Sequence, residues 1–471
     1  MKKKFGSIIM AGMLACTMTA GIAFAGCGNV AAPDIDIPEG GYDGSEVTVK
    51  FYHTMGSNLS DVLDEYIVEF NKLYPNIHIQ WEAVGGYDDV RNQISTEITV
   101  GNQPNMAYCY PDHVALYNTS GAVQTLDTLI NSDIKITRAD NTTESLGLTK
   151  DQINDFIPGY YQEGRQFGDE RMYTLPFSKS TEVLYYNKTF FEANQIKVPE
   201  TWDELGDACQ KILDKTGGKT ADGKTIFPLG YDSEANWFIT MCEQYGSPYT
   251  SATGDHFLFN NDKNKEFVSK FKGWYDKGYF TTQAINGTYT SNLFVAQESF
   301  MSIGSSAGAT HQRPSKVGAD YPFEVGIAPI PQVNKDKPKA ISQGPSICIF
   351  KKENPQEVLA TWLFAKYLTT DVAFQASFSN ASGYVPVLKS VADFPAYKTK
   401  LDKADGGDNI AYLSAKVCME QANAYYTSPA FNGSSKARDE VGSLIQAVFT
   451  GSKTLEQAFK DAIDECEYFA G

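Results

Sequence analysis

The sequence predicts an α/β protein with two lobes, each made of a β-sheet flanked by helices. Strand-like and helix-like segments alternate from residue 47 onward, which is typical of a sheet with helices on its faces. Three long extended runs interrupt this alternation, at 175–187, 341–350 and 383–387. Such a run between two α/β units is the form a chain takes when it crosses from one sheet to another, so we expect three crossings between the lobes.

The first lobe is predicted to begin with a strand at 47–52, where β-branched and aromatic residues favour extended structure. Apolar residues then recur every three or four positions from Leu59 to Leu73, which gives a helix one apolar face, and Pro75 marks its end. The alternation continues with a strand at 77–84, a helix at 88–100 and a strand at 106–110. This order predicts a parallel sheet, in which ligands bind beyond the carboxyl ends of the strands, near loops such as 110–112.

The second lobe is predicted from a new alternation after the first extended run. Its segments are a helix at 202–213, a strand at 226–230 and a helix from Asn236. Because the other two extended runs take the chain back to the first lobe and out again, both lobes should be built from separate parts of the sequence. The chain has 471 residues, enough for two or three domains.

The N-terminal residues have the composition of an export signal. Three lysines at positions 2–4 precede an uncharged stretch at 5–24 that is mostly apolar or small, as in a secretory signal peptide. A transmembrane anchor is the alternative, but the stretch runs directly into small residues and Cys27. The body of the protein is therefore predicted to lie outside the cytoplasm.

The four residues that end at Cys27, Phe-Ala-Gly-Cys, resemble a bacterial lipobox. The resemblance implies that residues 1–26 are removed and that Cys27 is acylated, which would anchor the protein to the outer face of the cell membrane. Cys16 is a weaker candidate because it lies inside the apolar stretch. Residues 27–43 are rich in Gly, Pro, Ala and Asp, cannot bury a core, and are predicted to form a flexible tether.

Net charge and cysteine spacing exclude several classes of function. The formal net charge is −17, and removal of the three N-terminal lysines lowers it to −20, which argues against binding to nucleic acid or broadly to an anionic membrane surface. Six cysteines follow Cys27, namely Cys109, Cys209, Cys242, Cys348, Cys418 and Cys466. Their spacing is not typical of a zinc site, so no metal or other cofactor is expected, and their pairing stays open.

Two motifs match enzyme patterns without the surroundings that those enzymes need. Residues 218–225 match a phosphate-binding loop, but a helix precedes them and a strand follows, the reverse of that motif. Residues 304–308 match a hydrolase nucleophile elbow, but His311 is the only later histidine and no acid lies between Ser306 and His311. We therefore predict that the protein is not an enzyme, with a secreted glycosidase or other hydrolase as the distant alternative.

Nine segments together resemble the family 1 extracellular solute-binding proteins of ABC importers. They are residues 51–55, 86–87, 101–104, 176–188, 301–308, 344–350, 383–386, 437–438 and 449–451. The resemblance covers residues 47–469 and is greatest to receptors for sn-glycerol-3-phosphate and glycerophosphodiesters. It implies the type II periplasmic-binding-protein fold, in which two α/β lobes close on one ligand. Residues 44–181 and 345–388 would form the first lobe, and residues 182–344 and 389–471 the second.

The resemblance also implies a set of ligand-binding residues that converge on one cleft. They are Tyr87, Asp112, Ser180, Trp237, Ser306 (or its neighbour Ser305), Gly344, Tyr384 and Arg438. An arginine offers a fork of donors to a phosphate, a carboxylate accepts from hydroxyls, and aromatic rings cover apolar carbon faces. The alternatives are core packing for Trp237, a solvated surface charge for Arg438, a helix N-cap for Asp112 and a turn position for Tyr384.

The function implied by the resemblance is capture of a small polar ligand and its delivery to the permease subunits of an ABC importer, by a protein expected to be monomeric. The ligand would be glycerol-3-phosphate or a glycerophosphodiester. The sequence departs from the glycerophosphate receptors in three ways: a second tryptophan near Trp237 is absent, Asp112 stands for a glutamate, and Lys179 replaces a small polar residue. Lys179 would lie near enough to help bind an anion, and the lost tryptophan leaves a neutral sugar or oligosaccharide as the alternative ligand.

Overall fold

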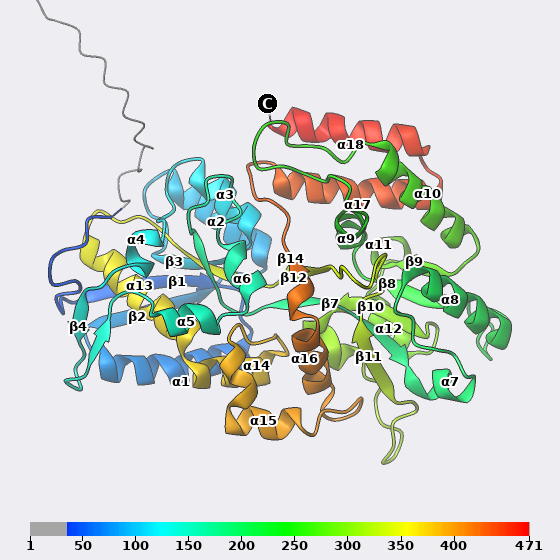
Figure 1. Cartoon of the computed structure of the whole chain (residues 1–471), viewed down its shortest axis with the longest axis horizontal. Helices are drawn as coiled ribbons and strands as arrows, with labels where there is room; N and C mark the ends of the chain where they lie inside the picture. Colours follow the sequence, from blue (N-terminus) through cyan, green and yellow to red (C-terminus); the bar gives the residue numbers. More distant parts are fainter. Residues whose placement is uncertain (1–34, 471) are drawn as a thin grey trace, which may run out of the picture.

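The computed structural model describes residues 35–470, and these form the two predicted lobes, side by side along the long axis of the molecule (Figure 1). Each lobe has a sheet, covering helices and an apolar core of its own. The α/β, two-lobed prediction is therefore confirmed. The predicted signal peptide, Cys27 and the first part of the predicted tether lie outside the described residues.

Within residues 35–470, the first sheet has five strands, in the order β2-β1-β3-β13-β6. These are β1 (Val47–His53), β2 (Ile77–Ala83), β3 (Met106–Cys109), β6 (Thr174–Pro176) and β13 (Ser346–Ile349). β1 is parallel to β2 and β3, as predicted, but β13 is antiparallel to both β3 and β6. β6 therefore runs in the same direction as β3, and the prediction of a parallel sheet is wrong for β13 alone, which enters the sheet from the second lobe.

The second sheet has seven strands within the described part of the chain, in the order β14-β12-β7-β10-β8-β9, with β11 also paired to β7. They are β7 (Ser180–Asn187), β8 (Leu229–Tyr231), β9 (Phe280–Thr282), β10 (Met301–Ser305), β11 (Val325–Pro329), β12 (Ala340–Gln343) and β14 (Tyr425–Tyr426). β8 begins three residues later than predicted because Pro228 has no N–H to donate to a neighbouring strand.

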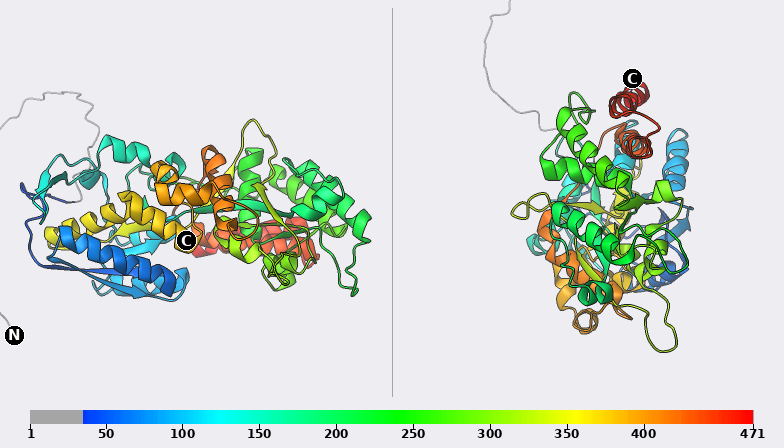
Figure 2. Two further views of the ribbon diagram at one scale, coloured as in Figure 1. Left: turned by 90° about the horizontal axis from the view of Figure 1, so that it is seen from below. Right: turned by 90° about the vertical axis from the view of Figure 1, so that its right-hand side faces the viewer.

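Helices cover both sheets. The first lobe has α1 (Ser57–Leu73), α2 (Tyr87–Ile98), α3 (Pro111–Asn118), α4 (Asp127–Ile130), α5 (Lys150–Asp155), α6 (Pro158–Glu163), α13 (Pro355–Thr370) and α14 (Val372–Ser382). The second lobe has α7 (Lys188–Ala193), α8 (Trp202–Thr216), α9 (Glu234–Tyr245), α10 (Asp262–Asp276), α11 (Gln283–Asn286), α12 (Thr290–Val295), the 3-10 turn η1 (Ser306–Gln312), α17 (Ser434–Thr450) and α18 (Leu455–Ala470). Figures 1 and 2 show α17 and α18, in orange-red and red, packed together on the second lobe.

Local sequence signals explain where these helices begin and end. α1 buries Leu63 and Phe70 on the predicted apolar face. α8 begins with a capping box, in which the Thr201 hydroxyl accepts from the Glu204 N–H and the Glu204 carboxylate accepts from the Thr201 N–H. It ends at Gly217, whose φ of 67° lies in the left-handed region that favours glycine. In the part of the chain that the structure describes, no helix is both long and apolar enough to cross a membrane.

The three extended runs meet between the lobes. The first run divides into β6 in the first sheet and β7 in the second, and the second run divides into β12 and β13. The third run lies beside the first, where the backbones of Lys179 and Val385 exchange hydrogen bonds with N–O distances of 3.3 and 2.7 Å. Residues far apart in sequence therefore form one narrow connection between the lobes.

The third run does not lead straight into the second lobe. It continues through η2 (Lys389–Asp393) and α15 (Pro395–Leu401), which place Val391 and Tyr397 in the first core. The chain packs on the second lobe only at α16 (Ile410–Glu420), followed by the short turn η3 (Ala422–Ala424). The predicted lobe limits stay a prediction, and we propose that the first lobe extends to about residue 401 rather than 388.

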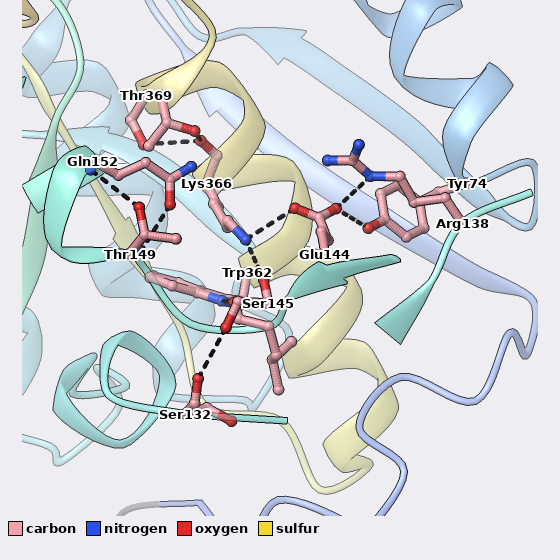
Figure 3. A network of polar contacts seen from close by, with 12 residues as sticks. Tyr74, Ser132, Arg138, Glu144, Ser145, Thr149, Gln152, Trp362, Lys366 and Thr369 are labelled. Carbon is pink, nitrogen blue, oxygen red and sulfur yellow. Dashed lines mark hydrogen bonds and ion pairs between the residues drawn. The ribbon is translucent and has the colours of Figure 1, made fainter. Parts of the chain in front are cut away.

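A buried polar network fastens a small β-ribbon to the outer end of the first lobe (Figure 3). The ribbon consists of β4 (Lys135–Thr137) and β5 (Thr143–Ser145). Glu144 accepts from Arg138 at 2.7 Å and pairs with Lys366 of α13 at 3.0 Å. Burial alone would raise the pKa of Glu144, but these two cations hold it below its ordinary value. The network lies away from the connection between the lobes and makes this end of the lobe a stable support.

Candidate ligand-binding cleft

A cavity of about 310 Å³ lies between the two lobes. The first lobe contributes Tyr110, Pro111 and Asp112. The second lobe contributes the larger part, namely Ile239, Tyr249, Thr250, Ile341, Ser342, Gln343, Thr427, Ser428, Pro429, Ala430, Ser434 and Arg438. The lining combines two tyrosines, several hydroxyls, one carboxylate and one guanidinium. This composition suits a small polar ligand that has both apolar carbon faces and hydroxyl groups.

The wall of the first lobe is the loop that follows β3, as the sequence predicted for a ligand-binding loop. Tyr110 precedes α3, Pro111 takes its first position, and Asp112 lies in its first turn. A carboxylate is favoured there because the first turn of a helix carries free N–H groups. Behind this loop, the ring centroid of Tyr110 lies 4.6 Å from that of Tyr87. Burial, and then Tyr110 and Tyr384 nearby, raise the pKa of Tyr87 well above its ordinary value.

The opposite wall carries Arg438, on α17. This guanidinium is partly buried and donates to the side-chain oxygen of Asn236. No carboxylate among residues 35–470 lies within ion-pair distance of Arg438, whereas Lys436 on the same helix is paired with Glu440. Arg438 is therefore a cation at the cavity whose charge is not neutralised by direct contact with an acid.

Below the cavity lies a buried group of polar side chains that we call the hinge network. It consists of Glu163, Lys179, Ser342, Ser346 and Thr427. Lys179 is 0% exposed, and its Nζ pairs with Glu163 at 2.5 Å and donates to the Gly344 carbonyl at 3.0 Å. The prediction that Lys179 helps to bind an anion is therefore wrong, because its charge is buried and already paired.

The structure brings two of the eight predicted ligand residues, Asp112 and Arg438, to the cavity wall. Tyr87 and Tyr384 lie behind Tyr110, as described above. Trp237 is 4% exposed and does not line the cavity, since it packs in the second core with its ring 4.8 Å from that of Phe271. The helix that carries Trp237 turns this face inward, which is the alternative that the sequence left open.

The remaining three predicted residues lie at the connection between the lobes and have structural contacts. Ser180 is buried at the start of β7, and the Ser306 hydroxyl accepts from the Thr181 N–H at 3.1 Å. Gly344 has a φ of 89°, and a Cβ there would lie 2.4 Å from the Ser178 carbonyl oxygen. Their predicted contact with a ligand stays a prediction.

The sequence predicted that the loop 110–112 lies near the ligand, but it did not single out Tyr110 as a ligand-binding residue. The position of Tyr110 directly after β3 could have indicated this role. Tyr249, Thr250 and residues 427–430 reach the cavity from loops without a recognisable pattern. Ser342 lies in the second extended run, and its hydroxyl reaches both the cavity and Glu163. Only the folded chain shows that these segments meet.

The enzyme-like motifs do not form enzyme-like sites. Residues 218–225 connect α8 to β8, as the sequence predicted. Ser306 is buried, whereas His311 is exposed. The six described cysteines are buried and free, and no group of three His, Cys, Asp or Glu side chains in residues 35–470 is arranged to hold a metal ion.

Comparisons with known proteins agree with the two-lobed fold. The sn-glycerol-3-phosphate-binding periplasmic protein UgpB of Shigella dysenteriae is 22% identical over 431 residues, which cover 88% of this chain and 91% of that protein. The cyclic alpha-maltosyl-1,6-maltose binding protein of Arthrobacter globiformis has the same fold, with a TM-score of 0.69 and 20% identity over 90% of this chain and 99% of that one.

A second solved structure with this fold is UgpB of Mycobacterium tuberculosis in complex with glycerophosphocholine. Its TM-score is 0.68 and its identity 16%, over 90% of this chain and 99% of that one. The family model for bacterial extracellular solute-binding proteins matches residues 65–404, which is more than half of the chain. The chain therefore belongs to the bacterial extracellular solute-binding protein family, as its sequence motifs predicted.

Proposed function

We propose that this solute-binding protein captures glycerol-3-phosphate or a glycerophosphodiester between its lobes and delivers it to the permease of an ABC importer. The observation that carries the proposal is Arg438, a partly buried cation on the cavity wall with an amide partner and no acid in contact. Leaving such a charge without an anionic partner is costly, whereas a phosphate supplies the bidentate acceptor that a guanidinium binds best. Asp112 on the opposite wall can accept from the glycerol hydroxyls.

A neutral sugar or oligosaccharide is the second candidate ligand. The cavity is lined by Tyr110 and Tyr249, whose rings can cover the apolar faces of a sugar. The hydroxyls of Thr250, Ser428 and Ser434 can bind sugar oxygens. The fold similarity to a receptor for a cyclic maltosyl-maltose supports this reading in the same family.

A thermal-shift screen of sugars, polyols, glycerol-3-phosphate and glycerophosphodiesters should identify the ligand class. A ligand that binds only the folded state at 100 times its Kd stabilises it by about 2.7 kcal/mol, which should raise the Tm of a protein of this size by about 3 °C. We expect this shift with glycerophosphates and a smaller one with neutral sugars. The bound ligand should be recovered unchanged from the protein by mass spectrometry, because we propose no chemistry at this site. Recovery of a hydrolysed ligand would contradict the receptor function.

The proposed anchor is a lipid on Cys27, and we propose that the anchored protein is a monomer at the outer face of the membrane. The support is the lipobox-like sequence after an apolar stretch. Cys27→Ala should release the protein from the membrane fraction or leave it with an uncleaved N-terminus, as seen by intact-mass spectrometry. Cys16→Ala is the matched control and should be processed normally. An unmodified mature N-terminus downstream of Cys27 would contradict the anchor but not the receptor function.

A further inference from the structure

A buried chain of hydrogen bonds runs from the cavity into the second lobe behind Arg438. The guanidinium donates to the side-chain oxygen of Asn236 on α9, and the Asn236 amide nitrogen donates to Glu182 on β7 at 2.9 Å. The second carboxylate oxygen of Glu182 accepts from the Tyr231 hydroxyl at 2.5 Å. Arg438 is thus linked to a carboxylate that it does not touch.

The polarity of this chain follows from the chemistry of its members. An ionised carboxylate only accepts and a guanidinium only donates. Asn236 must therefore turn its nitrogen toward Glu182 and its oxygen toward Arg438, since the opposite orientation would place two acceptors against each other and two donors against each other. Glu182 is 1% exposed, so no water competes for this arrangement. The carboxylate fixes the amide, and the amide fixes the guanidinium.

The Glu182 carboxylate is unusual because none of the described residues places a cation in contact with it. The groups that face it are Tyr231 on β8, Asp232 after β8, Asn236 on α9, Tyr426 on β14 and Arg438 on α17. Burial, partly offset by hydrogen bonds from Tyr231 and Asn236 and by the charge of Arg438, raises its pKa to about 7. A buried carboxylate without a cationic partner is destabilising even when hydrogen-bonded, which argues that its position serves the site in front of it.

The charges around the cavity are few. Arg438 is a cation on the wall formed by the second lobe, and Asp112 is a carboxylate on the wall formed by the first lobe. Lys179 and Glu163 neutralise each other in the hinge network. A ligand therefore contacts one cation and one carboxylate, with a second carboxylate, Glu182, buried behind the cation. The first negative charge of a ligand can pair with Arg438, whereas a second negative charge has no second cation among the described residues of the cavity lining to pair with and is repelled by both acids.

We propose that Glu182 positions Arg438 through Asn236 and makes the cavity selective for a ligand that carries a single negative charge. This inference rests on the proposed function and narrows it. A glycerophosphodiester, with one ionised phosphate oxygen, is the preferred ligand, and glycerol-3-phosphate, which carries nearly two negative charges above its second pKa of about 6, binds more weakly.

Calorimetry with a glycerophosphodiester and with glycerol-3-phosphate between pH 5.5 and 8.5 tests this role. At pH 8 the wild-type protein should prefer the phosphodiester by about tenfold in Kd. The phosphodiester keeps one charge over this range, yet its affinity should increase several-fold as the pH falls through 7, because protonation of Glu182 leaves the charge of Arg438 uncompensated. Glu182→Gln should reduce the preference, since Asp112 remains, and should abolish the pH dependence.

Glu234→Gln is the matched control. Glu234 is also a buried carboxylate of this lobe, but it accepts from the Ala284 N–H at 3.2 Å and is not in the chain behind Arg438. This variant should keep the wild-type preference and pH profile. Asn236→Asp is a second variant, which places a carboxylate directly against Arg438 and should weaken the binding of both anions at least about tenfold.

The outcomes separate this inference from the proposed function. If the wild-type protein binds neither anion and binds a neutral oligosaccharide instead, both are wrong. If it binds the anions but Glu182→Gln retains the preference and the pH profile, only the role of Glu182 is wrong. If Asn236→Asp binds the anions with wild-type affinity, the role of Glu182 is wrong, even if Glu182→Gln does not fold.

The thermal stability of the wild-type protein should also depend on pH, because the stabilising protonated form of Glu182 is fully present below pH 4.5 and is lost as the pH rises through 7. The Tm of Glu182→Gln should lose this part of the pH dependence.

Discussion

Replacing Arg438 by alanine should weaken the binding of a glycerophosphate by about two orders of magnitude, because the change removes a charge-assisted, bidentate contact worth a few kcal/mol. The cavity gives the ligand no second free cation, since Lys179 is buried and paired with Glu163. The guanidinium therefore has no substitute among the residues that line the cavity. Isothermal calorimetry on the purified mature protein measures the loss directly.

Lys436→Ala is the control for this experiment. Lys436 lies on the same helix, two residues before Arg438, but it pairs with Glu440 and does not line the cavity. Its removal should change the affinity less than about twofold, because the partly buried pair with Glu440 does not line the cavity. Asp112→Ala should weaken glycerophosphates and neutral sugars alike, because both present hydroxyls. Tight binding of a neutral oligosaccharide that Arg438→Ala leaves unchanged would contradict the glycerophosphate proposal and leave the family assignment intact.

Periodicity predicted the early part of the fold because its elements are local. β1 and α1 follow from alternation, apolar spacing and Pro75, all within about thirty residues. The order of the sheets does not follow in this way, since β13 joins the first sheet from residues 346–349 and lies antiparallel between β3 and β6. Such a pairing is decided by contacts across the whole chain, which a local pattern does not contain.

Part of the candidate site could be predicted from sequence, because some of its residues follow directly after a predicted strand or lie in a recognisable segment. Asp112 follows β3, so the strand pattern indicated its loop, whereas Arg438 was indicated by the family resemblance of residues 437–438. The position of Trp237 could not be predicted, because a tryptophan on a helix can equally pack in a core or line a cleft. Glu182 and Glu163 were missed altogether. Their importance comes from burial and from hydrogen bonds to residues distant in sequence, Asn236 for Glu182 and Thr427 for Glu163.

The hinge network joins parts of the chain that belong to different crossings. Glu163 ends α6 in the first lobe, Lys179 lies in the first crossing, and Ser342 lies in β12 next to its last residue, beside the second crossing. The Lys179 backbone is also paired with Val385 of the third extended run. One buried ion pair therefore lies where all three extended runs meet, and the backbone of its lysine joins the third run. Because Ser342 and Thr427 line the cavity and also donate to Glu163 at 3.1 Å, the network adjoins the cavity.

Glu163→Gln should lower the free energy of unfolding by about 3–5 kcal/mol, since it leaves the Lys179 ammonium as an unpaired charge in a site that is 0% exposed. Chemical denaturation followed by circular dichroism measures this loss. The double variant Glu163→Gln with Lys179→Met should recover much of it, because removing both charges of a buried pair is far less costly than removing one. Lys188→Ala breaks the exposed pair with Glu324 and should cost less than about 1 kcal/mol. If Glu163→Gln alone is as stable as this surface control, the ion pair does not hold the lobes together, and the connection depends on its backbone hydrogen bonds instead.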